Sequence, residues 1–235
     1  MPFLDHLEQL RWVILKSLSA LLLSFVATWA FTDRVYDLLM RPLTGMEEVK
    51  LVFSGPLEGV LLKLKLAMLG AFVLALPFIL WFAWEFISPG LKGRERHLGI
   101  WVMTAGTGCF LVGAAFAYGV IPLSLRFLVS FGPSDIEQLW QVKSYIDFAF
   151  RLIVACGVLF ELPLVMVLIT RLGLVDVETL ARGRPVAVVL AFTLAAILTP
   201  PDVITQLMLG IPLIGLFEVG LLLGRLQKPS KVGEP

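Results

Sequence analysis

Residues 98–121, LGIWVMTAGTGCFLVGAAFAYGVI, contain no charged side chain over 24 positions. A helix rises about 1.5 Å per residue and the hydrocarbon core of a bilayer is about 30 Å thick, so this stretch is long enough to span a membrane. Transmembrane strands would instead alternate apolar and polar residues over about ten positions. The stretch therefore predicts an α-helical membrane protein.

The composition of the whole chain agrees with that prediction. Of 235 residues, 58% are hydrophobic and 16% are charged, against about 25% charged in an ordinary soluble domain. The mean hydropathy is +0.91. These values exclude a soluble enzyme and a disordered protein, and a net charge of +1 gives no bulk attraction to nucleic acid.

Further apolar stretches bring the expected number of transmembrane helices to six. They form one all-α, polytopic domain of residues 1–226, followed by a tail of residues 227–235. On the outer face, residues 32–43 and 122–131 have amphipathic patterns typical of helices that lie along a membrane surface, and Pro42 is expected to end the first. The expected spans are residues 12–31, 60–85, 98–121, 150–170, 186–199 and 203–224.

The basic residues predict the orientation. An even number of spans places both termini on one side, where the expected segments hold 11 of the 19 Lys and Arg residues. Since Lys and Arg concentrate in cytoplasmic loops, both termini are predicted in the cytoplasm. The first apolar stretch is longer than the core of a cleavable signal, so we expect a retained helix. The segments counted are residues 1–16, 86–97, 171–185 and 225–235.

The fifth and sixth spans are joined by Thr199-Pro200-Pro201-Asp202. Two prolines cannot continue the fifth helix, which is left with 14 residues and a length of about 21 Å. A helix this short requires local thinning of the bilayer. Thinning would suit a protein that helps something large to cross the membrane.

Polar residues within the spans need a separate explanation. Glu161 lies mid-span, where a carboxylate costs about 2.5–3.5 kcal/mol, so it either faces a functional cavity or bonds to a neighbouring helix. Pro163 predicts a break in that helix. Gln206 could hydrogen-bond to a partner helix. Cys109 and Cys156 lack metal-ligand spacing and are expected to pack in the core, so no metal site or cofactor is predicted.

The cytoplasmic segments carry ordered motifs. These motifs are His6-Leu7-x-x-Leu10-Arg11, Phe86-Ile87-x-Pro89-x-Leu91 followed by Glu95-Arg96, Gly113-x-x-Phe116-Ala117-Tyr118, Phe160-Glu161-x-Pro163, Arg184-Pro185 and Thr199-Pro200-Pro201-Asp202. Over residues 3–226 the chain resembles the TatC family, the core membrane subunit of the twin-arginine protein translocase.

The resemblance implies a function and a concave bundle of helices. TatC proteins are receptors for signal peptides with consecutive arginines, and they work with TatA, TatB and other TatC copies to move folded proteins across the membrane by the proton-motive force. It also implies roles for single residues. Those expected to bind the signal peptide are Glu8, Gln9, Arg11, Phe86, Leu91, Glu95 and Arg96; those expected to meet a partner helix are Glu161, Thr199 and Gln206; and those expected to shape the outer face are Pro42, Tyr118 and Asp202.

The N-terminal motif departs from the family pattern. The family usually has Glu where this chain has Gln9, and Glu8 stands one position earlier. A shift of one residue turns a side chain by about 100° around a helix. Either Glu8 substitutes from an adjacent face, or Glu95 carries most of the arginine recognition, since a carboxylate accepts a guanidinium in a bidentate, charge-assisted pair.

Three other functions compete with this one. An ion or proton transporter would use Glu161 and Glu218, but no inverted repeat is found. An intramembrane enzyme lacks a catalytic set, because both histidines, His6 and His97, lie outside the expected spans, so no enzymatic activity is expected. A structural scaffold would leave the acidic residue of the Glu95 loop unexplained, and direct binding of a twin-arginine peptide discriminates between these alternatives.

Overall fold

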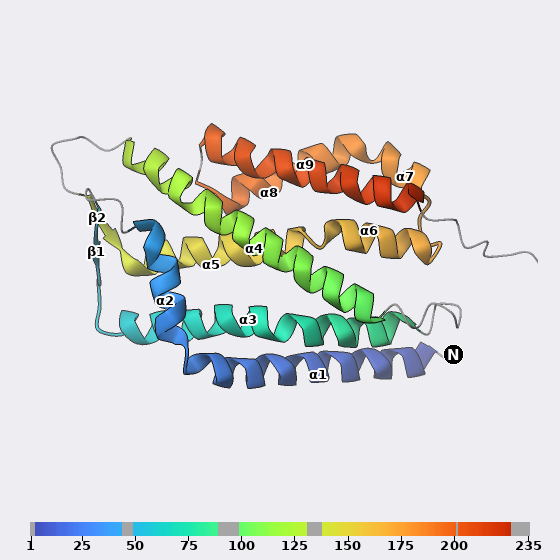
Figure 1. Cartoon of the computed structure of the whole chain (residues 1–235), viewed down its shortest axis with the longest axis horizontal. Coiled ribbons are helices and arrows are strands. Elements are labelled where there is room, and N and C mark those ends of the chain that lie inside the picture. Colours follow the sequence, from blue (N-terminus) through green and yellow to red (C-terminus); the bar gives the residue numbers. More distant parts are fainter. Residues whose placement is uncertain (1–2, 44–48, 89–98, 131–137, 201, 227–235) are drawn as a thin grey trace, which may run out of the picture.

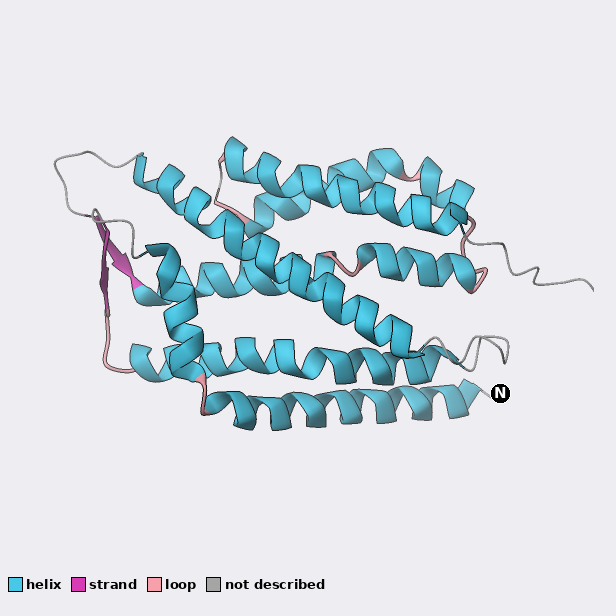
Figure 2. Ribbon diagram, viewed as in Figure 1, coloured by secondary structure: helices cyan, strands magenta, loops and turns pink. Residues whose placement is uncertain are grey.

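The computed structural model describes residues 3–43, 49–88, 99–130, 138–200 and 202–226, and this part of the chain is mostly helical (Figures 1 and 2). The elements in chain order are α1 (Phe3–Trp29), α2 (Thr32–Met40), a short 3₁₀ helix (Arg41–Leu43), β1 (Val49–Val52), α3 (Glu58–Ile87), α4 (Gly99–Ser130), β2 (Gln138–Gln141), α5 (Val142–Leu159), α6 (Leu162–Arg171), α7 (Val177–Arg182), α8 (Arg184–Leu198) and α9 (Val203–Leu226).

Within the described residues, five helical segments are long and apolar enough to cross a membrane. They are α1 from Leu7, α3, α4, the α5–α6 pair and α9. The predicted polytopic helical membrane fold is therefore confirmed. α8 has 15 residues and is about 22 Å long, so it is shorter than the hydrocarbon core is thick.

Most of the helices lie along one common direction, whereas α4 is inclined to it and α2 stands across it (Figure 1). α1 and α3 run side by side in opposite directions, and α4 crosses the bundle between α3 and the α8–α9 pair. α1 begins and α9 ends at the same end of the bundle, which we call the terminal end. α2 and the two strands lie at the opposite end, which we call the distal end.

Small residues allow the central helices to pack closely. Ala67, Ala71, Ala117 and Ala149 are fully buried, and close approach of backbones is the usual role of small residues between membrane helices. α1, in contrast, leaves large apolar side chains exposed along its outer face, as a lipid-facing helix does. These residues include Leu18, Leu22, Leu23 and Val26.

The predicted break beside Glu161 is confirmed. α5 ends at Leu159 and α6 begins at Leu162, with Pro163 in the first turn of α6. Proline has no backbone N–H to donate and its ring crowds the preceding turn, so a continuous helix is interrupted here. The break directs the Glu161 backbone out of regular helix in the middle of the fourth span.

The two stretches with amphipathic patterns form different structures. Residues 32–40 form α2, and the short 3₁₀ turn that contains Pro42 follows it. Residues 122–130 instead continue α4 without a break, so they are not a separate capping helix. A proline inside a helix removes one backbone bond, and packing against neighbouring helices compensates for that loss at Pro122.

A two-stranded parallel ladder was not expected from the sequence. β1 pairs with β2 in the register Val49–Gln138 through Val52–Gln141. Each strand has four residues, and the two come from loops that are separated by α3 and α4. The ladder joins the loop before α3 to the loop before α5 at the distal end (Figure 2).

Candidate functional site

A cavity of about 440 Å³ lies between the N-terminal half of α1 and the last turn of α3. Gln9, Trp12, Val13 and Lys16 are spaced at i, i+3, i+4 and i+7, so they form one face of α1. The wall opposite is built from the end of α3, which runs antiparallel to α1. The lining residues are Gln9, Trp12, Val13, Lys16, Glu85 and Phe86.

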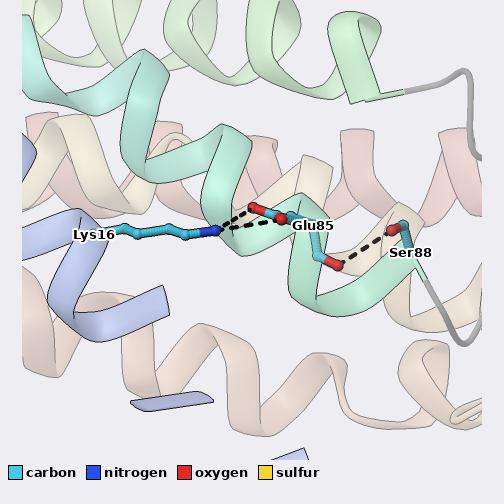
Figure 3. A network of polar contacts seen from close by, with 3 residues as sticks. All are labelled: Lys16, Glu85 and Ser88. Carbon is cyan, nitrogen blue, oxygen red and sulfur yellow. Dashed lines mark hydrogen bonds and ion pairs between the residues drawn. The ribbon is translucent and has the colours of Figure 1, made fainter. Parts of the chain in front are cut away.

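The cavity contains an ion pair between the two helices (Figure 3). The Lys16 ammonium lies 3.1 Å from Glu85 Oε2 and 3.3 Å from Oε1. The side chains are 43% and 55% exposed, respectively. The Ser88 hydroxyl donates to the Glu85 backbone carbonyl at 3.2 Å, which leaves the carboxylate to Lys16. The pair is thus accessible from outside rather than sealed in the core.

The sequence-predicted binding residues fall into three groups. Gln9 and Phe86 line the cavity together. Glu8 and Arg11 are exposed on α1 and are not among the lining residues. The remaining predicted members lie outside the described residues; they are Leu91, Glu95 and Arg96.

Sequence reasoning missed Trp12, Lys16 and Glu85 as parts of this site. A signal was present: Lys16 is a lone charge in an apolar run, seven residues after Gln9 and hence on the same helix face. Glu85 lies at the end of the second expected span, residues 60–85, and its local sequence does not relate it to Lys16.

Glu161 lies between α4 and α6. Both of its carboxylate oxygens are buried, and no described residue donates a hydrogen bond to either. A Cβ atom added at Gly106 would lie 3.1 Å from Oε2, so the glycine on α4 makes room for the carboxylate. The interpretation in which Glu161 bonds to a neighbouring helix finds no such bond among the described residues.

The other intramembrane carboxylate has a partner. Glu218 on α9 accepts two hydrogen bonds from the Arg184 guanidinium, at 2.6 Å from Nε and 2.9 Å from Nη2. This bidentate geometry is the strongest form of an arginine–carboxylate pair. It connects the start of α8 to α9, so the structural interpretation of Glu218 is favoured.

Polar groups at the α8–α9 connection bond within the hairpin. Thr199 donates its hydroxyl to the Ala195 carbonyl at 2.8 Å, and the Gln206 amide donates to the Phe192 carbonyl at 3.3 Å. Asp202 is buried and caps α9, because its carboxylate accepts the Thr205 backbone N–H at 2.6 Å and the Thr205 hydroxyl. These polar groups therefore find hydrogen-bond partners within the hairpin itself.

Two tyrosines attach α2 to the bundle at the distal end. Tyr118 on α4 donates its hydroxyl to the Leu38 carbonyl at 2.9 Å. Tyr145 on α5 donates to the Leu39 carbonyl, and Leu39 itself is buried in the core. Tyr118 and Tyr145 thus connect α4 and α5 to the end of α2.

Comparison with known proteins agrees with this arrangement. Residues 5–212 match the family model described as Sec-independent protein translocase protein (TatC). The chain belongs to the TatC family. The TatC protein of Desulforapulum autotrophicum is 36% identical over 98% of this chain and 86% of its own length, and that of Aquifex aeolicus is 34% identical over 98% of both.

Solved TatC structures share the fold. A crystal structure described as the twin-arginine translocase receptor TatC in DDM superposes with a TM-score of 0.86 at 35% identity, covering 94% of this chain and 100% of that chain. Family membership and the apolar helices make this chain an integral membrane protein and a transport component of the Tat translocase, which acts together with other Tat subunits.

Proposed function

We propose that this TatC-family chain is the signal-peptide receptor and core component of the twin-arginine translocation system. In this function it binds the paired arginines of a signal peptide at the terminal end. With TatA and TatB it then moves folded proteins across the cytoplasmic membrane, using the proton-motive force. The observation that carries the proposal is the cavity in which Gln9 of α1 and Phe86 of α3 meet.

The chemistry of the expected residues supports arginine recognition. A guanidinium presents a planar fork of donors that a carboxylate accepts in two parallel hydrogen bonds, whereas lysine offers only a point charge. Glu95 is the predicted acceptor in the loop that follows Phe86. Glu8 lies on α1 outside the cavity lining, so it is the weaker candidate to replace the carboxylate that Gln9 lacks.

The α8–α9 hairpin is the proposed docking surface for a single-span partner. α8 is short, and Thr199 and Gln206 mark its connection to α9. A short helix thins the bilayer around it, which lowers the barrier that a translocating protein meets. The carboxylate of Glu161 accepts no hydrogen bond from a described residue, and we expect a TatA helix to contact it, because unsatisfied polar groups between membrane helices favour a hydrogen-bonding partner.

Peptide binding to the purified full chain in detergent tests the receptor function. A peptide with an Arg-Arg pair should bind, and the same peptide with Lys-Lys should bind at least tenfold more weakly. Glu95→Ala should weaken binding more than Glu8→Ala does. Equal affinity of the unmodified chain and Glu95→Ala for the Arg-Arg peptide would contradict the assignment.

Photo-crosslinking tests the partner surface. A photoreactive residue at position 199 or 206 should crosslink to TatA or TatB in membranes that contain both. A probe at exposed Leu23 on α1 is the matched control, since it faces outward from a different helix. Equal crosslinking from Leu23 and from the hairpin would exclude the hairpin as a preferred docking surface.

A further inference from the structure

Among the described residues that line the cavity, Glu85 is the one carboxylate. Gln9 lines the same cavity with a neutral amide. Among the described lining residues, the negative charge therefore comes from α3 and not from α1. Lys16 is paired with it.

We propose that Glu85 binds an arginine of the signal peptide and that Lys16 is an internal competitor which the arginine displaces. This inference rests on the proposed receptor function and adds a recognition residue to it. Glu85 would thus supply the negative charge that the neutral amide of Gln9 lacks. Discrimination between arginine and lysine would arise at Glu85, because the incoming cation has to compete with a lysine that is already there.

The accessibility of the pair allows such an exchange. Glu85 and Lys16 are both about half exposed, so a ligand approaches the carboxylate without opening the helix pair. The volume of the cavity falls within the range of ordinary ligand sites, about 300–1,000 Å³. Trp12 and Phe86 supply apolar walls against which the methylene groups and the flat guanidinium of an arginine pack.

Besides Glu85, the Lys16 ammonium already has a second favourable contact. Lys16 Nζ lies 5.7 Å from the centre of the Phe82 ring, within the range of a cation–π contact, and its side chain reaches solvent. Releasing Lys16 from Glu85 therefore does not bury an unpaired charge. A guanidinium gains two parallel hydrogen bonds to Glu85, whereas a second ammonium would gain no more than Lys16 already has.

The competing interpretation is that the pair only ties α1 to α3. The two interpretations differ in the sign of one effect. If the pair is only a tie, removing either partner loosens the same contact, so both substitutions change peptide binding in the same direction or not at all. If Lys16 competes with the peptide, removing Lys16 frees Glu85 and tightens binding, whereas removing Glu85 weakens it.

The experiment measures binding of an Arg-Arg peptide, otherwise neutral, to the detergent-purified full chain and its variants. Glu85→Gln should raise the Kd roughly tenfold, the scale of one charge-assisted hydrogen-bond pair at a half-exposed site. Lys16→Gln should lower the Kd about two- to fivefold, the range expected for release of an exposed ion pair. Binding of the Lys-Lys peptide should also tighten in Lys16→Gln.

Matched controls come from an ion pair at the distal end. Lys63 and Asp33 are exposed and lie 4.0 Å apart, so Lys63→Gln and Asp33→Asn make the same charge changes far from the cavity. Both should leave the Kd unchanged, which separates local contact from a general effect of net charge. Melting temperatures of all variants in the same detergent establish that each one is folded.

The outcomes separate the inference from the proposed function. Failure of the unmodified chain to bind the Arg-Arg peptide overturns the receptor function and this inference with it. Normal binding that is unchanged in Glu85→Gln, or weakened in Lys16→Gln, overturns the role of Glu85 alone. If Glu85→Gln does not fold, the Lys16→Gln result decides: unchanged or weaker binding by that variant overturns the inference.

Discussion

Gly113 on α4 lies where α4 packs against α5. A Cβ atom at this position would lie 2.6 Å from the Cys156 carbonyl oxygen and 2.8 Å from the Phe160 Cβ. Ordinary van der Waals contact begins near 3.4 Å, so Gly113→Ala requires a separation of about 0.8 Å between two backbones. Backbone atoms of packed helices do not move aside as the end of a flexible side chain does.

The matched control is Gly108 on the same helix, where an added Cβ would meet nothing within 4 Å. Replacing Gly by Ala favours the helix by about 1 kcal/mol at either position. That gain cancels when the two variants are compared. Overpacking, which costs about 1–3 kcal/mol, acts only at Gly113, so Gly113→Ala should be less stable than Gly108→Ala by that amount.

Thermal unfolding of the two variants in one detergent measures this difference. A change of 1 kcal/mol shifts the Tm of a chain of this length by about 2–4 °C, so the Tm of Gly113→Ala should lie about 2–12 °C below that of Gly108→Ala. Monodispersity on size exclusion after heating gives a second readout. Equal Tm values would refute the close contact between α4 and α5 from which the expectation is worked.

Three further substitutions test other parts of the structure. Asp202→Ala should lower the free energy of unfolding by about 1–2 kcal/mol, because α9 loses its N-terminal cap. A Tm equal to that of the unmodified chain would show that the cap contributes nothing to stability. Tyr118→Phe removes the hydrogen bond to the Leu38 carbonyl, which is worth about 1 kcal/mol. Amide hydrogen exchange in α2, measured by mass spectrometry, should become faster. An unchanged exchange rate would show that this hydrogen bond does not hold α2 to the bundle. Glu161→Gln keeps the shape of the side chain but removes a buried carboxylate to which no described residue donates a hydrogen bond. The Tm should therefore stay the same or rise. A clear fall in the Tm would show that the carboxylate makes a stabilising contact.

The parts of the fold that could be predicted from the sequence are those that depend on local sequence patterns. Apolar runs indicate membrane helices because the bilayer imposes a fixed length on them, and Pro163 and the Pro200-Pro201 pair locate interruptions because proline lacks a donor. The amphipathic spacing of residues 32–40 likewise predicts α2. Each of these signals lies within one helix or turn of the residue that it explains.

The remaining features depend on residues that are distant in the sequence. β1 and β2 are four-residue strands whose pairing partner is about 90 residues away, and short strands carry almost no periodic signal. The Lys16–Glu85 pair spans 69 positions, and neither residue has a local pattern that indicates the other. At Pro122 tertiary packing outweighed the local tendency of proline to end a helix, so α4 continued to Ser130.

The described ion pairs between helices lie toward the two ends of the bundle. Lys16–Glu85 and Arg184–Glu218 join helices toward the terminal end, and Lys65–Asp147 joins α3 to α5 toward the distal end. Such pairs hold helices together where charge is tolerated, near the ends of spans. Glu161 breaks the pattern, because it lies in the middle of a span with no described partner.

Among these pairs, Lys16–Glu85 is distinguished by the cavity it lines. Arg184–Glu218 is bidentate, so an incoming guanidinium would gain nothing over the one already in place. Lys16 presents a point charge instead, and its carboxylate partner is open to a better-matched cation. Lys63–Asp33 and Lys65–Asp147 also present an ammonium, but neither pair lines this cavity, so Lys16–Glu85 is the described pair at which we expect exchange for an arginine.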